Sequence, residues 1–169
     1  MRVEIWSDVV CPWCFIGKRR FDNALEVLRQ KGFTEPIEVV FKAYQLDPTA
    51  PIGNPSPVVD SYAKKFGGRE RAEQILHHVT SVAAADNIEF NMDIALRANT
   101  ILAHRALHWA LTHHGAQVQT VYKERLMKAY FTDGLNVGDY YWLLAVGTPT
   151  HHEERELYNV MYGAEKFLY

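Results

Sequence analysis

The chain has 169 residues, of which 48% are hydrophobic, 12% aromatic and 22% charged, so intrinsically disordered, collagen-like and low-complexity proteins are excluded. The 18 basic and 20 acidic residues give a formal net charge of -2, and we expect no binding to nucleic acid or to an anionic membrane surface. No apolar run approaches the roughly 20 residues of a membrane span, and no signal-peptide core follows Met1. We therefore expect a cytoplasmic protein.

The first part of the sequence predicts a strand, a helix and a second strand. Residues 3–6 form a short apolar run with β-branched side chains, which is typical of a strand. Apolar side chains at three- and four-residue spacing over residues 21–28 indicate an amphipathic helix, which Lys31 and Gly32 end. Residues 37–44 are typical of a second strand. Because a helix connects the two strands, we expect them to pair in parallel.

Beyond residue 48 the sequence predicts mostly helices. Four prolines and a glycine in residues 49–57 indicate a boundary between subdomains. Apolar stripes predict the helices that follow, with Asn99 as the N-cap of the third. These helices are expected at residues 58–66, 72–82, 100–113 and 118–130. A capping-box pattern at residues 150–153 predicts a last short helix through Met161.

The two cysteines, Cys11 and Cys14, are separated by only two residues, and the chain has no others. A disulfide-stapled secreted scaffold or a four-cysteine zinc site needs more thiols. Three interpretations remain: a redox pair, a zinc site completed by histidines, or two packed structural cysteines. The redox pair is favoured because the motif follows a predicted strand and opens a predicted helix, with no second pair to complete a metal site.

The position of Cys11 at the amino end of a helix predicts its chemistry. Unpaired backbone N–H groups and the helix dipole stabilise a thiolate there, so the pKa of Cys11 is expected to fall. Pro12 suits the first helical turn, and Trp13 is expected to be exposed beside the site, where it can contact a substrate. Cys14 lies one turn later and can attack a mixed disulfide formed at Cys11. We expect Asp8, three residues before Cys11, to be a turn residue that faces water.

The eight histidines offer a weaker hypothesis of a metal site. His104 and His108 have the i, i+4 spacing of metal-binding helices, but Arg105 and Ala106 stand between them where a metalloprotease has its glutamate. We expect both to be packed or hydrogen-bonded in the core, and no metal to be bound. The adjacent pairs are expected to be solvated at the surface. These pairs are His77–His78, His113–His114 and His151–His152.

Residues 6–17, which include Cys11, Pro12, Trp13 and Cys14, resemble the active-site segment of the DsbA-like thioredoxin superfamily, and in particular its cytoplasmic FrnE-like branch. The resemblance extends over residues 2–139. Its further motifs are residues 41–48, 99–105 and 129–139. It implies an α/β, thioredoxin-like βαβ fold with a helical insertion. It also implies dithiol–disulfide exchange at Cys11 and Cys14 on protein or small-molecule disulfides, without a bound cofactor but with glutathione or another thiol as a co-substrate.

Members of this family continue after the position of Asp139 with a cis-proline loop, a β-hairpin and a final helix. Residues 140–169 predict no such strands, so the second half of the thioredoxin domain is expected to be missing or divergent. We therefore divide the chain into a βαβ part at residues 1–48, a helical insertion at 49–139 and a divergent tail at 140–169. Either the apolar residues 140–146 or a second copy, in a homodimer, would then cover the exposed sheet.

Two further functions remain open at this point. One is a non-catalytic binding protein, or truncated family member, that retains the helical part and has lost turnover. The other is a relative of the glutathione-dependent transferases and isomerases, which typically carry serine at the position of Cys11. The sequence leaves the substrate-binding residues unassigned.

Overall fold

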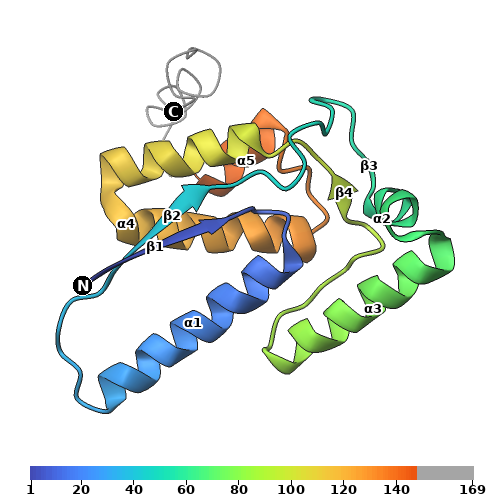
Figure 1. Ribbon diagram of the computed structural model, residues 1–169. Coiled ribbons are helices and arrows are strands. Elements are labelled where there is room, and N and C mark those ends of the chain that lie inside the picture. The colour runs from blue at the N-terminus through green and yellow to red at the C-terminus, as the bar shows by residue number, and fades with distance from the viewer. Residues whose placement is uncertain (148–169) are drawn as a thin grey trace.

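The computed structural model describes residues 1–147, and the main sheet of this part has two parallel strands (Figure 1). Strand β1 is Arg2–Ser7 and strand β2 is Glu38–Ala43. Their register runs from Arg2 opposite Glu38 to Ser7 opposite Ala43. Helix α1, Pro12–Gln30, connects the two strands. The predicted strand–helix–strand unit and its parallel pairing are confirmed.

The centre of β2 forms part of the buried interior. Val40 and Phe41 are buried, whereas Val3 and Ile5 of β1 are half-buried. Trp6, near the end of β1, is exposed. The sheet is therefore covered mainly along β2, against which a later helix packs.

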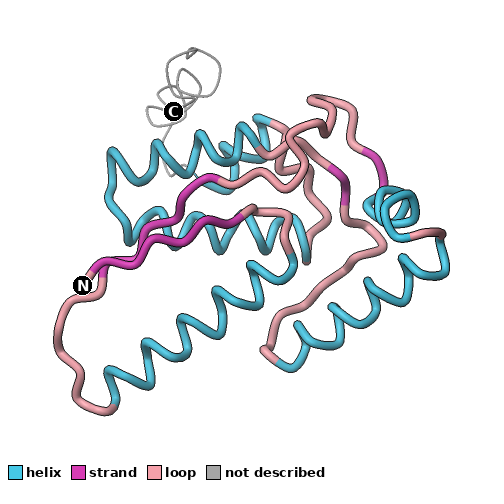
Figure 2. Tube along the Cα trace, viewed as in Figure 1, coloured by secondary structure: helices cyan, strands magenta, loops and turns pink. Residues whose placement is uncertain are grey.

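Two helices and a short strand pair follow β2. Their bounds are β3 Ser56–Pro57, α2 Val58–Phe66, α3 Arg69–Ala85 and β4 Leu96–Arg97. Strands β3 and β4 pair antiparallel over two residues each and are the small strands seen apart from the main sheet in Figure 2. Gly67 ends α2 with a φ of 88°, a left-handed conformation that only glycine adopts at no steric cost. The predicted helices at 58–66 and 72–82 are confirmed.

Helix α4, Ile101–Phe131, is a helical hairpin that reverses at Gly115 (Figure 1). Gly115 has φ 84° and ψ 175°, which interrupts the helix between the two segments. This agrees with the two separate helices that the sequence predicts. The N-cap is Thr100, one residue later than predicted, although the Asn99 side chain still accepts a hydrogen bond from the N–H of Ile101 at 3.0 Å.

Helix α5, Tyr140–Gly147, packs against α4. The Tyr122 hydroxyl donates a hydrogen bond to the carbonyl of Leu143 at 2.7 Å, and Leu143 is buried. The apolar segment that was expected to cover the sheet therefore packs on a helix. The predicted helix at 150–161 and the pair His151–His152 lie outside the described residues. Among the helices of residues 1–147, none is long and apolar enough to cross a membrane.

One side chain of α4 takes the place of a neighbouring strand at β2. The amide of Gln119 accepts a hydrogen bond from the N–H of Phe41 and donates one to its carbonyl, both at 2.9 Å. The same amide donates to the carbonyl of Leu107, at 3.2 Å, across the α4 hairpin. Gln119 is buried, so these backbone groups have no access to water through it.

Replacing Gln119 by leucine is expected to lower the free energy of unfolding by about 2–4 kcal/mol, because it leaves two buried backbone groups of Phe41 unpaired. Urea unfolding of the variant measures this loss. Gln30→Leu is the control, since the exposed Gln30 bonds only to Glu26 and its replacement should change stability by less than about 0.5 kcal/mol. Equal stabilities of the two variants would contradict the structural role of Gln119.

Candidate active site

Cys11 is the N-cap residue of α1, and the first turn of the helix is built around it. Its carbonyl accepts hydrogen bonds from the N–H groups of Cys14 at 3.1 Å and Phe15 at 3.2 Å. Its Sγ also accepts from the N–H of Cys14, at 3.3 Å. Pro12 follows in the first helical turn, which contains no acidic residue. The sulfur of Cys11 thus lies where the helix presents unpaired donors to an anion.

The two thiols are not joined by a disulfide, and they titrate together. The hydrogen bond between them lowers one pKa of the pair to about 6 and raises the other above the ordinary range of a thiol. One proton is therefore shared between two sulfurs at neutral pH, and these two values belong to the pair. The site holds one thiolate and one thiol, which is the state needed to attack a disulfide.

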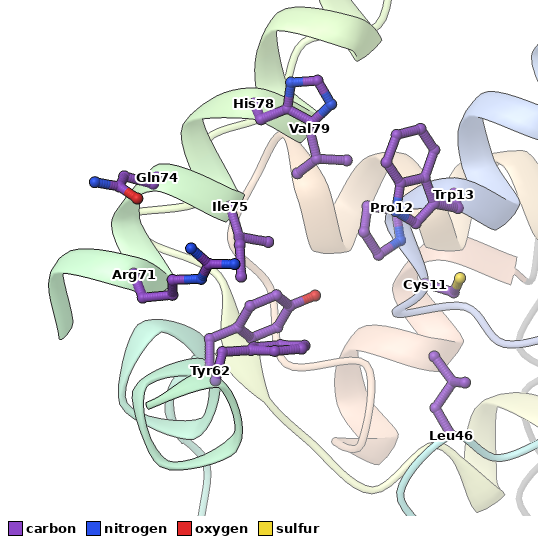
Figure 3. Close-up of a pocket in the computed structure, with 11 residues that line it drawn as sticks. Cys11, Pro12, Trp13, Leu46, Tyr62, Arg71, Gln74, Ile75, His78 and Val79 are labelled. Atoms are coloured by element: carbon purple, nitrogen blue, oxygen red, sulfur yellow. The ribbon is translucent and has the colours of Figure 1, made fainter. Parts of the chain in front are cut away.

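Cys11 is the sulfur that an external molecule can reach. It lines a cavity of about 440 Å³, together with Pro12 and Trp13 (Figure 3). Cys14 instead packs against the hydrophobic core and does not line this cavity. Trp13 is 53% exposed, so its predicted exposure beside the site is confirmed. A substrate in this cavity would meet Cys11 first.

The far wall of the cavity comes from α2 and α3, which the sequence analysis did not connect with the site. Tyr62 and Phe66 of α2 lie opposite Cys11, and Arg71 and Ile75 of α3 lie above them. The hydroxyl of Tyr62 points into the cavity (Figure 3). Burial, and then the nearby charge of Cys11, raise the pKa of Tyr62, so this hydroxyl keeps its proton. It is a potential donor that faces the reactive sulfur.

Asp8 does not face water, and this prediction was wrong. Its side chain is buried, at 1% exposure for the residue, beneath the cysteine motif. The carboxylate accepts from the N–H of Val9 and the N–H of Leu46, both at 2.8 Å, and from His104 Nε2 at 3.2 Å. Burial alone would raise the pKa of Asp8, but the hydrogen bonds from His104 and Leu46 outweigh it and hold the pKa below its ordinary value.

His104 is a buried, hydrogen-bonded residue as predicted, and its partner is this carboxylate. Because an ionised carboxylate can only accept, Nε2 of His104 carries a proton. His108 is exposed, which corrects the prediction that it is packed in the core. The pairs His77–His78 and His113–His114 are exposed, as expected. Within residues 1–147, no three side chains of the metal-binding types lie together as a metal site requires.

Lys123 brings a cation under the cysteine pair. The residue is 0% exposed, its Nζ donates to the carbonyl of Ser7 at 3.2 Å, and it lies 5.3 Å from the centre of the Phe41 ring. Burial lowers the pKa of Lys123 to about 8, although the negative charges of Asp8 and of the cysteines act in the opposite direction. Its positive charge in turn favours the thiolate at Cys14.

A sequence model of the DSBA-like thioredoxin domain matches residues 2–163. The chain belongs to this family. The fold is thioredoxin-like and of the DsbA type, as the resemblance implied. A probable DsbA oxidoreductase from Streptomyces coelicolor is 29% identical, with a TM-score of 0.80 over 94% of this chain and 67% of its own. The cytosolic disulfide reductase DsbM from Pseudomonas aeruginosa is 16% identical, with a TM-score of 0.60 over 95% of this chain and 67% of its own, and supports the fold alone.

The Bacillus subtilis protein YwbO is 26% identical to this member of the DSBA-like family over 142 residues. The match covers 82% of this chain and 60% of YwbO, so the chain spans about three fifths of the length of this relative. The structural relatives that share the DSBA-like fold include disulfide oxidoreductases.

Proposed function

We propose that this chain is a thiol–disulfide oxidoreductase that acts through Cys11 and Cys14. The observation that carries the proposal is the position of Cys11: its sulfur caps a helix, shares one proton with a neighbouring thiol and lines an open cavity. A structural cysteine pair would need none of these features. The DsbA-type fold of the chain supports the same chemistry.

The reaction follows from the two sulfurs. The thiolate of Cys11 attacks one sulfur of a substrate disulfide, the substrate S–S bond breaks, and the departing sulfur leaves as a thiolate that takes up a proton. Cys14 then loses its proton and attacks Sγ of Cys11, which breaks the mixed disulfide and releases the second substrate thiolate. The substrate gains two electrons, and the cysteine pair becomes a disulfide. The hydroxyl of Tyr62 is placed to donate a hydrogen bond to a sulfur that gains charge in the cavity.

Turnover requires a reductant for the new disulfide, and we assign this role to glutathione or another small thiol. Such thiols keep cysteine pairs reduced in the cytoplasm, which is where we place the activity. In that compartment the pair acts on substrates as a reductant. No bound cofactor is needed, because the cysteine pair itself carries the electrons.

A Cys14→Ser variant is expected to stop at the mixed disulfide, because no second thiol remains to release the substrate. Intact-mass measurement after incubation with a protein or small-molecule disulfide should show one adduct per chain, removable by dithiothreitol. The wild type should release both products, and the Cys11→Ser variant should form no such trapped adduct through the cavity. A Cys14→Ser chain that stays unmodified would contradict the proposal and favour a non-catalytic binding protein.

A further inference from the structure

The cavity at Cys11 has one charged side chain on its wall, and that charge is positive. Its lining residues include Arg71 and no carboxylate. The other contributors near the sulfur are apolar or aromatic, among them Trp13, Tyr62 and Phe66. A molecule that fills this space would place an apolar body between the aromatic rings and could place an anionic group only at Arg71.

Arg71 is also available for such a contact. Within residues 1–147 its guanidinium makes no ion pair and no hydrogen bond, whereas the neighbouring Arg69 is paired with Asp60 at 3.5 Å and with Glu73 at 2.9 Å. Figure 3 shows the side chain of Arg71 directed to the cavity beside Tyr62, while the amide of Gln74 points away from it. The unpaired cation therefore belongs to the cavity and not to the surface network of α3.

We infer that the preferred substrate is a small organic disulfide with an aromatic or other bulky apolar group next to the sulfur and a carboxylate beyond it. This inference rests on the proposed function, because the sulfur must react with Cys11. A volume of about 440 Å³ suits a drug-sized molecule. The apolar group packs against Trp13 and Tyr62, and the carboxylate pairs with the planar donors of Arg71.

The reaction with such a substrate is the exchange already described. Cys11 forms the mixed disulfide with the half that occupies the cavity, and the other half leaves as a free thiolate. Attack by Cys14 then releases the bound half as a second thiolate, whose charge moves away from the sulfur pair as it is protonated. Glutathione or another small thiol returns the two electrons to the enzyme.

Two matched disulfides test the role of the charge, namely 4,4′-dithiodibenzoate and its neutral bis-amide, 4,4′-dithiodibenzamide. Both carry the same ring beside the sulfur and differ in charge at the far end. The ratio of their second-order rate constants with the reduced protein is the quantity measured. In the Arg71→Gln variant we expect this ratio to fall about fivefold relative to wild type, which is the size of an accessible ion pair, and high salt should reduce the wild-type ratio.

Arg69→Gln is the matched control, because it removes the same charge from the same helix at a position that faces other side chains. Its ratio is expected to equal that of the wild type. A ratio that stays unchanged in Arg71→Gln, or falls equally in both variants, overturns the inference while leaving disulfide exchange intact. If neither disulfide reacts with the wild type beyond the rate of a free thiol, the proposed function fails and the inference with it.

Discussion

Replacing Cys11 by serine is expected to abolish disulfide turnover and to remove the thiol that titrates near pH 6. In the wild type the hydrogen bond between the two thiols sets this low pKa, and the N–H groups at the start of α1 support the thiolate. A thiol with this pKa is about 90% ionised at pH 7, compared with about 3% for a free cysteine, so its alkylation should be about 30-fold faster. The rate of reaction with iodoacetamide between pH 4 and 10 measures the titration.

The two single variants separate the contributions to this pKa. Without Cys11, the remaining Cys14 has lost its hydrogen-bonding partner and is held against the core, so its alkylation should be slow at pH 7. Without Cys14, Cys11 keeps the helix start but loses the shared proton, so its midpoint should lie between about 6 and 8.5. Reactivity near pH 6 that survives in Cys11→Ser would show that Cys14 is the attacking sulfur.

The same titration has a consequence for stability. A thiol whose pKa is lowered by folding stabilises the reduced protein above its unfolded value, and this contribution disappears as the pH falls through the folded value. The reduced wild type should therefore gain stability over the Cys11→Ser variant as the pH rises from about 6 to 9.

The parts of the site that are local in sequence could be predicted from it. Cys11, Pro12, Trp13 and Cys14 lie in one helical turn, so their arrangement follows from the start of α1 alone. The strand–helix–strand order is local in the same sense, because apolar periodicity and helix-ending residues mark each element.

The buried charges could not be predicted in this way, because they meet only through the tertiary structure. Asp8 contacts a histidine 96 positions later, and Lys123 contacts Ser7 across 116 positions. The periodicity of α4 was also misleading, since Val118 and Val121 are exposed while Gln119 and Lys123 are buried. One signal was present: Gln119 and Lys123 are spaced like Met127 along the helix face that packs inward.

The cavity wall was missed for a related reason. Tyr62 and Arg71 belong to helices that carry ordinary amphipathic patterns, and nothing in such a pattern says that one end of a helix faces a cysteine 51 or more positions earlier. Only the packing of α2 and α3 beside the start of α1 brings these side chains to Cys11 (Figure 3).

Replacing Asp8 by alanine is expected to lower the free energy of unfolding by about 3–5 kcal/mol, a large share of the roughly 5–15 kcal/mol of a typical domain. The change leaves the N–H groups of Val9 and Leu46 and the ring of His104 without their acceptor. It also leaves the Lys123 ammonium without its nearest carboxylate charge. Asp60→Ala is the control, since its carboxylate is exposed and pairs only with Arg69 at 3.5 Å.

The pH dependence of this loss has a defined sign. Folding lowers the pKa of Asp8, so its contribution is present above the unfolded value of about 4 and disappears as the pH falls through the folded value. Urea unfolding at pH 7 and at pH 3 should therefore show a smaller difference between wild type and Asp8→Ala at the lower pH. A difference that is constant with pH would mean that the packing of Asp8, and not its charge, supports the fold.

The same two buried charges are expected to shift the cysteine titration in opposite directions. Asp8→Asn removes a negative charge that opposes the thiolate, so the midpoint of alkylation should move below the wild-type value near pH 6. Lys123→Met removes the cation that favours the thiolate, so the midpoint should move above it. Each unit of this shift corresponds to about 1.4 kcal/mol, or about 30 mV in the reduction potential of the pair, with the stronger oxidant having the lower thiol pKa. Shifts of the same sign in both variants would show that loss of packing under the cysteines, and not charge, controls their reactivity.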